Sequence, residues 1–129
     1  MLINQKSVAV VDDDSSMRQA IERLLNAAGF STLTFSSAET FLQSSPAAGA
    51  ACLVFDIHLP GLSGFELQER LVQTGVVHPV IFISAYDDPD SQSRAAALGA
   101  IAYIKKPFQG QRLIAAIRRV FGESSDNTK

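Results

Sequence analysis

Stretches suited to strands and stretches suited to helices alternate five times along the chain, and this alternation limits the fold more than any other feature. The strand-like stretches cover residues 7–11, 31–35, 51–55, 79–83 and 101–104. Apart from 31–35, which is the weakest of the five, they are apolar almost throughout. Short apolar runs of this kind are typical of parallel strands that are covered on both faces.

Apolar residues recur at helical spacing between these stretches. The predicted helices run from Ser15 or Ser16 to Ala28, and then over 38–43, 63–72, 90–98 and 110–121. Ser15 or Ser16 is the expected N-cap of the first helix, and Gly29 ends it. Strands that alternate with helices through short connections predict an α/β fold, with a doubly wound five-stranded parallel sheet between two layers of helices.

The composition indicates one soluble domain. The chain has 129 residues, of which 47% are hydrophobic, so we expect a single domain with a substantial core over residues 1–122. Residues 123–129 are polar and lack periodicity, and we interpret them as a flexible tail or as the start of a linker to an output domain. The net charge of −2 argues against direct contact with nucleic acid.

Cysteine usage and hydropathy indicate the compartment. The single cysteine, Cys52, lies in an apolar stretch, where we expect it to be a buried core residue, and it fits a reducing compartment. No stretch approaches the roughly 18 apolar residues of a membrane span, and the N-terminus lacks the apolar segment of a signal peptide. We therefore expect a cytoplasmic protein without membrane contact.

Polar side chains of a few reactive types end or follow four of the predicted strands. Asp12, Asp13 and Asp14 follow the first strand, Asp56 ends the third, Ser84 ends the fourth and Lys106 follows the fifth. In an open parallel sheet, ligands bind at the carboxyl ends of the strands. These side chains are therefore expected to converge in one crevice. Asp14 is also expected to favour the start of the first helix.

Asp12, Asp13 and Asp56 would crowd three carboxylates together, and like charges so close need a counter-ion or a raised pKa. A hard divalent cation meets that need, and Mg²⁺ is the usual ion at phosphoryl sites. Lys106 adds an ammonium group and Ser84 a hydroxyl. A carboxylate nucleophile, a metal, a cation and a hydrogen-bond donor together indicate phosphoryl transfer. Each residue alone would be an ordinary turn or surface residue, so the combination carries the inference.

These residues resemble the receiver domains of two-component response regulators. The resemblance covers about residues 7–121 and is carried by VAVVDDDSSMRQAI at 8–21, LVFDIHLPGLSGFEL at 53–67, PVIFISAYDD at 79–88 and GAIAYIKKPF at 99–108. The segments LPGLSGFEL and SAYDD are most similar to FixJ-like receivers, which carry a LuxR-type helix-turn-helix output. The resemblance implies a flavodoxin-like (βα)5 fold with strand order 2-1-3-4-5.

The resemblance also assigns roles around a metal ion. Asp56 would be the phosphoacceptor and a ligand of Mg²⁺, with Mn²⁺ as an alternative ion. Asp13 would bind the ion directly, and Asp12 would act through a water molecule or shape the site. The backbone carbonyl of His58 would be a further ligand. The side chains of His58 and Tyr86 would tune the loss of the phosphoryl group, and no other cofactor is implied.

Three residues would link phosphorylation to a change of surface. Lys106 would pair with Asp56 and then with the phosphoryl group, Ser84 would hydrogen-bond a phosphoryl oxygen, and Tyr103 would be the switch aromatic that turns inward. Ser84 stands where the family more often has threonine, so it keeps the hydroxyl and loses a methyl group. Pro107 matches a position whose preceding peptide bond is usually cis.

The implied activity is that of a signalling switch that catalyses only its own phosphorylation and dephosphorylation. A sensor histidine kinase would donate the phosphoryl group, and the surface of the fourth helix, fifth strand and fifth helix would change. That surface would then form a phosphorylation-dependent homodimer or control an output domain that binds DNA and regulates transcription. The receiver itself would contact neither nucleic acid nor membrane.

Three alternatives stay open from the sequence. The D-x-D pattern of Asp12 and Asp14 also occurs in haloacid-dehalogenase-type phosphatases, where Asp12 would be the nucleophile, although the chain is short for them and shows no cap segment. A flavodoxin-like fold also hosts flavin, but three acids after the first strand would repel a phosphate. A degenerate receiver would signal by protein contact alone.

Overall fold

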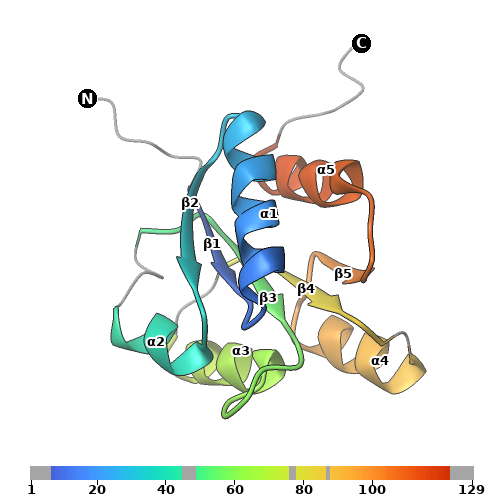
Figure 1. The fold of residues 1–129 in the computed structure, drawn as a ribbon. Helices are drawn as coiled ribbons and strands as arrows, with labels where there is room; N and C mark the ends of the chain where they lie inside the picture. The colour runs from blue at the N-terminus through green and yellow to red at the C-terminus, as the bar shows by residue number, and fades with distance from the viewer. Residues whose placement is uncertain (1–6, 45–48, 76–77, 87, 123–129) are drawn as a thin grey trace.

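The structure is a computed structural model that describes residues 7–44, 49–75, 78–86 and 88–122. Within these residues, five strands form one parallel sheet (Figure 1). They are β1 (Ser7–Val11), β2 (Ser31–Phe35), β3 (Cys52–Asp56), β4 (Val80–Ser84) and β5 (Ala102–Lys105). Their order is β2-β1-β3-β4-β5 and every neighbouring pair is parallel, which confirms the predicted sheet and strand order.

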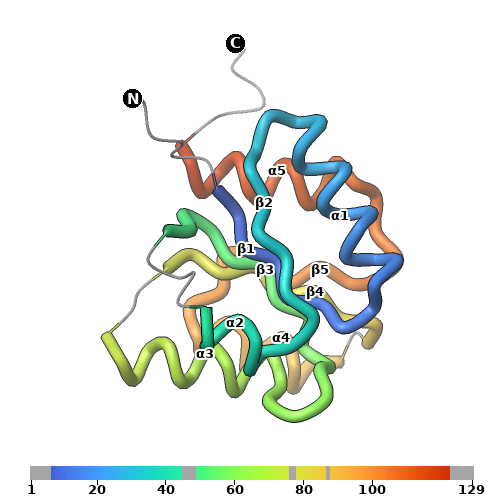
Figure 2. Tube along the Cα trace, turned by 60° about the vertical axis from the view of Figure 1, so that its left-hand side comes forward, coloured from blue at the N-terminus to red at the C-terminus, as the bar shows by residue number. Residues whose placement is uncertain are grey.

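Five helices follow the strands in the same part of the chain. They are α1 (Ser15–Ala27), α2 (Ala38–Gln43), α3 (Gly64–Gln73), α4 (Pro89–Ala97) and α5 (Gly110–Val120). Helices α1 and α5 cover one face of the sheet, and α2, α3 and α4 cover the other (Figure 1, Figure 2). The sheet is therefore enclosed on both sides, as its apolar strands require.

Alternate residues of the sheet enter two hydrophobic cores. In β1, Val8 and Val10 face the core under α1 and α5, whereas Ala9 and Val11 face the core under α2, α3 and α4. All four side chains are fully buried. Burying a valine-sized side chain stabilises a fold by about 1.5–3 kcal/mol, so each core contributes strongly to holding the sheet. The polar ends of the strands are placed by this rigid frame.

Three strands reach one residue past their apolar stretches, and β3 and β4 end at Asp56 and Ser84 as predicted. β5 ends at Lys105, and the register pairs Ser84 with Lys105. The apolar pattern marks where apolar side chains stop, whereas a parallel ladder depends on backbone groups and continues through a polar residue. Asp56 and Ser84 are therefore the last members of the sheet, which fixes their backbones more firmly than a loop would.

The first helix begins differently from the prediction. Asp14, and not Ser15 or Ser16, is the N-cap of α1, and its carboxylate accepts hydrogen bonds from Ser16 N at 2.9 Å and Met17 N at 3.3 Å. Aspartate and serine cap helices about equally well, but the aspartate charge also interacts favourably with the positive end of the helix dipole. The expected role of Asp14 at the helix N-terminus is confirmed.

The remaining expectations concern the core and the end of the chain. Cys52 is fully buried in β3, as predicted, and burial raises the pKa of its thiol to about 12. In the described part of the chain, no helix is both long enough and apolar enough to cross a membrane. Residues 123–129 lie outside the described residues, so their role as a tail or linker stays a prediction.

Candidate functional site

The carboxyl ends of four neighbouring strands bring the predicted site residues together. Asp56 and Ser84 end β3 and β4, Asp12 follows β1, and Lys106 follows β5. Because β1, β3, β4 and β5 are adjacent in the sheet, Asp12 and Lys106 come into contact although they are 94 residues apart. The backbone N–H of Lys106 also donates to the carbonyl of Ser84 at 2.6 Å and joins the ends of β4 and β5.

Three carboxylates gather at these strand ends. One oxygen atom each of Asp12, Asp13 and Asp56 lies within 4.8 Å of the other two. Asp12 is fully buried and Asp56 is 5% exposed, whereas Asp13 is exposed to solvent. A group of hard oxygen donors that is open on one side fits a divalent cation such as Mg²⁺.

The Lys106 ammonium group pairs with two of these carboxylates. Its Nζ atom lies 2.9 Å from Asp56 Oδ2 and 3.1 Å from Asp12 Oδ2, and the side chain is 15% exposed. Burial alone would lower the pKa of Lys106, but hydrogen bonding and charge attraction from Asp56, and then from Asp12, raise it above its ordinary value. Lys106 is therefore a fixed positive charge at neutral pH.

The negative charge of Asp12 is less well stabilised than the positive charge of Lys106. Burial is the main cause that raises the pKa of Asp12, and the nearby charge of Asp56 adds to it. A hydrogen bond from Asp14 N, which lies 3.0 Å from Asp12 Oδ1, and the charge of Lys106 act in the opposite direction. One lysine compensates three carboxylates only in part. The cluster is therefore short of positive charge, which a bound cation would supply.

Hydrogen bonds to the backbone orient the acidic residues. His58 N donates to Asp56 Oδ1 at 3.0 Å, so both carboxylate oxygens of Asp56 have partners. Arg18 Nη1 donates to the backbone carbonyl of Asp12 at 2.8 Å and ties α1 to the acidic loop. Arg18 could not be predicted as part of the site, because an arginine on a helix gives no signal of the backbone atom that it reaches. The His58 carbonyl as a metal ligand stays a prediction.

Helix α3 begins in close contact with the backbone of Asp56. A Cβ atom on Gly64 would collide with the Asp56 carbonyl group, and Gly64 N donates to Ile57 O at 3.0 Å. The apolar pattern predicts this glycine only as part of the helix over 63–72. A glycine in the first turn of a helix that follows a strand-end aspartate is the signal that could have revealed the close approach.

The two predicted switch residues share one neighbour. Ser84 Oγ accepts a hydrogen bond from Tyr86 N at 3.0 Å, and the Tyr103 hydroxyl donates to Tyr86 O at 2.7 Å. Ser84 is fully buried, and Tyr103 is half-buried against the core under α2, α3 and α4. The peptide bond before Pro107 is cis, as predicted. The roles of Ser84 and Tyr103 in switching stay predictions.

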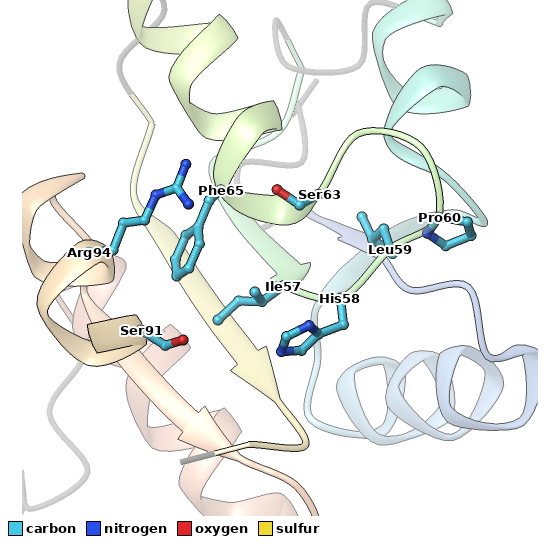
Figure 3. Close-up of a pocket in the computed structure, with 8 residues that line it drawn as sticks. All are labelled: Ile57, His58, Leu59, Pro60, Ser63, Phe65, Ser91 and Arg94. Atoms are coloured by element: carbon cyan, nitrogen blue, oxygen red, sulfur yellow. The ribbon is translucent and has the colours of Figure 1, made fainter. Parts of the chain in front are cut away.

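A pocket of about 540 Å³ lies between helix α4 and the loop after β3 (Figure 3). Its lining consists of Ile57, His58, Leu59, Pro60, Ser63 and Phe65 on one side and of Ser91 and Arg94 on the α4 side. The ring of His58, which lines the pocket, meets the ring of Tyr86 edge-on, and the ring centroids are 4.7 Å apart. The two residues predicted to tune the loss of a phosphoryl group are therefore in direct contact.

Comparison with known proteins identifies the family. Residues 8–118 match the response regulator receiver domain. Nodulation protein W of Bradyrhizobium diazoefficiens is 39% identical over 110 residues, which cover 85% of this chain and 48% of that protein. Transcriptional regulatory protein FixJ of the same organism is 33% identical over 122 residues, which cover 95% of this chain and 60% of that protein. The solved structure of the response regulator StyR superposes with a TM-score of 0.83 at 42% identity, covering 90% of this chain and 59% of that one.

The matched region contains the whole of the acidic cluster, Lys106, strands β2 to β5 and all of β1 except Ser7. The chain spans about half to three fifths of the length of these relatives. The FixJ relative confirms the predicted subfamily resemblance, and the match favours a receiver over a phosphatase or a flavin-binding protein. The chain belongs to the response regulator receiver domains, which are signalling switches and not conventional enzymes.

Proposed function

We propose that Asp56 accepts a phosphoryl group from the phosphohistidine of a sensor histidine kinase. The observation that carries this proposal is the ion pair of 2.9 Å between Asp56 and Lys106 at the edge of a cluster of three carboxylates. Asp56 keeps some exposed surface, whereas Asp12, the alternative nucleophile, has none. An incoming phosphorus atom therefore meets Asp56 first.

In the reaction, a carboxylate oxygen of Asp56 attacks the phosphorus atom in line with the histidine nitrogen. The new P–O bond forms an acyl phosphate while the P–N bond breaks. The imidazole keeps the electron pair of the broken bond, and because its other ring nitrogen carries a proton, a neutral imidazole leaves the site. Lys106 stabilises the negative charge of the transferring group, because its ammonium group is already held beside Asp56.

The acidic residues would also hold a metal ion. Asp13, Asp56 and the backbone carbonyl of His58 would bind Mg²⁺ or Mn²⁺, and Asp12 would act through a water molecule or shape the site. When bound, the ion neutralises charge on the phosphoryl oxygens. The three carboxylate oxygens within 4.8 Å and the deficit of positive charge around Asp12 support this assignment.

The acyl phosphate would then shift an existing equilibrium between two surfaces. Ser84 moves towards the phosphoryl group, Tyr103 turns inward, and the surface of α4, β5 and α5 changes. Both side chains are hydrogen bonded to the backbone of Tyr86, which supports a coupled movement. The Ser84 hydroxyl accepts from Tyr86 N and still has its own O–H to donate to a phosphoryl oxygen.

The last part of the proposal concerns the output. We infer that residues 1–122 form the receiver and that 123–129 lead towards a DNA-binding domain that regulates transcription. Support comes from relatives that are longer than their matched part and include a transcriptional regulatory protein. The changed surface would dimerise or release that output domain in the cytoplasm, and the receiver itself would touch neither DNA nor membrane.

Intact-mass measurement after incubation with acetyl phosphate tests the acceptor and the metal together. With Mg²⁺, the chain is expected to gain one phosphoryl group, and chelation by EDTA is expected to abolish that gain. Asp56→Asn is expected to stay unmodified under both conditions. Phosphorylation of Asp56→Asn at the full wild-type yield would contradict the assignment.

A further inference from the structure

The loop between β3 and α3, residues 57–63, starts directly after Asp56 and contains the proposed metal ligand His58. Most hydrogen bonds of its backbone N–H groups are local: His58 N donates to Asp56 Oδ1, and Leu59 N donates to Ile57 O. Two N–H groups are held from distant elements, and the first is Ile57 N, which donates to Ile83 O of β4 at 3.0 Å. The second is Leu62 N, which donates to Glu39 Oε2 at 2.9 Å, although the two residues are 23 positions apart.

Glu39 extends from a helix that is firmly anchored. It lies in the first turn of α2, where Ser37 caps the helix by accepting from Thr40 N at 3.0 Å. Phe41 of the same helix is fully buried. Its ring meets the ring of Phe55 in β3 edge-on, with the ring centroids 5.4 Å apart. Because α2 is anchored in the core through Phe41, the Glu39 carboxylate ties the loop to an element outside it.

The loop is shaped to receive this carboxylate. Gly61 has φ +75°, which favours glycine, and a Cβ atom there would lie 2.5 Å from Glu39 Oε2. The hydrogen bond from Leu62 N is the main cause that lowers the pKa of Glu39, so the acceptor is ionised at neutral pH. Hydrogen bonds to an ionised acceptor are stronger than neutral ones.

The carboxylate of Glu66 holds the next residue of the loop, but Glu66 lies in α3, the helix into which the loop leads. Ser63 N donates to Glu66 Oε1 at 2.9 Å, and Glu66 N donates back to Ser63 Oγ at 3.1 Å. Glu66 belongs to the helix that the loop itself begins, so it moves with the loop. Glu39 ties the loop to an independent helix, and Figure 3 shows the loop with Leu59 and Pro60 running between α2 and α3.

We propose that Glu39 is a positioning residue for the metal side of the site: by holding Leu62 N, it fixes the loop that presents the His58 carbonyl beside Asp56. The inference rests on the proposed function, in which that carbonyl is a metal ligand. Glu39 touches neither the ion nor the phosphoryl group. It makes the geometry of the ligand set depend on α2, which contributes no ligand of its own.

Isothermal titration calorimetry of the 129-residue chain with Mg²⁺ alone tests this role. Three variants are compared with the wild type. Glu39→Ala removes the acceptor and is expected to raise the Mg²⁺ dissociation constant about tenfold, the lower end of the effect of losing a residue that orients a ligand. Glu39→Gln keeps an oxygen acceptor and is expected to stay within about twofold of the wild type. Glu22→Ala removes a carboxylate from α1 and is the matched control, with no expected change.

Hydrogen exchange of the Leu62 amide, measured by NMR, accompanies the titration. We expect exchange to accelerate in Glu39→Ala and not in Glu22→Ala, whether or not Mg²⁺ is present. An unchanged dissociation constant in Glu39→Ala would overturn the proposal, as would equal weakening by Glu39→Gln and Glu39→Ala. A wild-type chain that binds no Mg²⁺ would instead overturn the metal assignment itself and this inference with it, so the two failures are distinct.

Discussion

The Tyr103 hydroxyl donates a hydrogen bond of 2.7 Å to the backbone carbonyl of Tyr86, at the exposed end of the segment that follows β4. The N–H of Tyr86 in turn donates to the buried hydroxyl of Ser84. A single residue thus joins β5 to the strand end where the acceptor site lies. In the proposed switch, movement of Ser84 towards a phosphoryl group would reach Tyr103 through the backbone of Tyr86.

Tyr103→Phe keeps the ring and removes this hydrogen bond. We expect acetyl phosphate to phosphorylate the variant to the wild-type yield, because the bond lies outside the acidic cluster. Losing a hydrogen bond worth about 1 kcal/mol should raise the resting population of the switched surface about fivefold. ¹H–¹⁵N spectra of α4, β5 and α5 would record this shift. Tyr86→Ala is the control, since it leaves the backbone carbonyl in place, and identical spectra for Tyr103→Phe and wild type would refute the coupling.

Asp12→Asn tests the deficit of positive charge through the pH dependence of the free energy of unfolding. A carboxyl whose pKa is raised on folding stabilises the native state below its ordinary pKa of 3.8, and this contribution is lost as the pH rises through the folded-state pKa. Without a divalent ion, Asp12→Asn should therefore raise the free energy of unfolding at pH 7, by about 1 kcal/mol, the common scale of single substitutions. Near pH 3 the two proteins should differ little.

Urea unfolding at both pH values measures this difference. Saturating Mg²⁺ at pH 7 should reverse the order of stability, because the wild type gains the binding free energy of the ion and the variant gains less. A variant that is less stable than the wild type at pH 7 without Mg²⁺ would show that the Asp12 charge is well compensated and would refute the deficit of positive charge.

Gly64→Ala tests the close approach of α3 to the strand end. Its Cβ would collide with the Asp56 carbonyl, and backbone cannot move aside as a side chain can. We expect a loss of about 1–3 kcal/mol in stability and slower phosphorylation, because the Asp56 backbone must shift. Gly110→Ala is the control, since its Cβ would meet only the end of the Leu24 side chain, at 2.9 Å. Thermal unfolding should show the smaller loss for Gly110→Ala, and equal losses would speak against the role of Gly64.

Cys52 provides a probe of global unfolding. Burial raises the pKa of its thiol to about 12, so at pH 8 almost no thiolate is present and reagents have no access to the sulfur. We expect an aromatic disulfide reagent to react slowly with the native chain and rapidly in denaturing urea. Fast stoichiometric reaction of the native chain would place Cys52 at an accessible surface and contradict its position in β3.

The fold and the main site residues were readable from the sequence because their signals are local. A buried parallel strand is apolar over five or so residues, so the run before Asp56 predicts both the strand and the residue at its end. The convergence of Asp12, Asp56 and Lys106 then follows from the rule that strand ends meet in an open sheet. Each step needs only neighbouring residues and a general rule of topology.

Other contacts depend on three-dimensional distances that no local pattern encodes. Glu39 reaches Leu62 because α2 packs beside the loop after β3, and Arg18 reaches a carbonyl whose direction is set by the turn after β1. The N-cap of α1 was misplaced for a different reason. Asp14 and Ser15 have nearly equal capping propensities, so only the actual path of the turn selects between them.

The most direct test of the central claim is a crystal structure of the chain with Mg²⁺ and beryllofluoride, a stable mimic of the phosphoryl group. We expect beryllium to be bonded to a carboxylate oxygen of Asp56, with fluorine atoms contacting Lys106 and Ser84 and the metal bound by Asp13. Beryllofluoride bonded to Asp12 would instead rule out Asp56 as the acceptor and favour the nucleophile of a phosphatase.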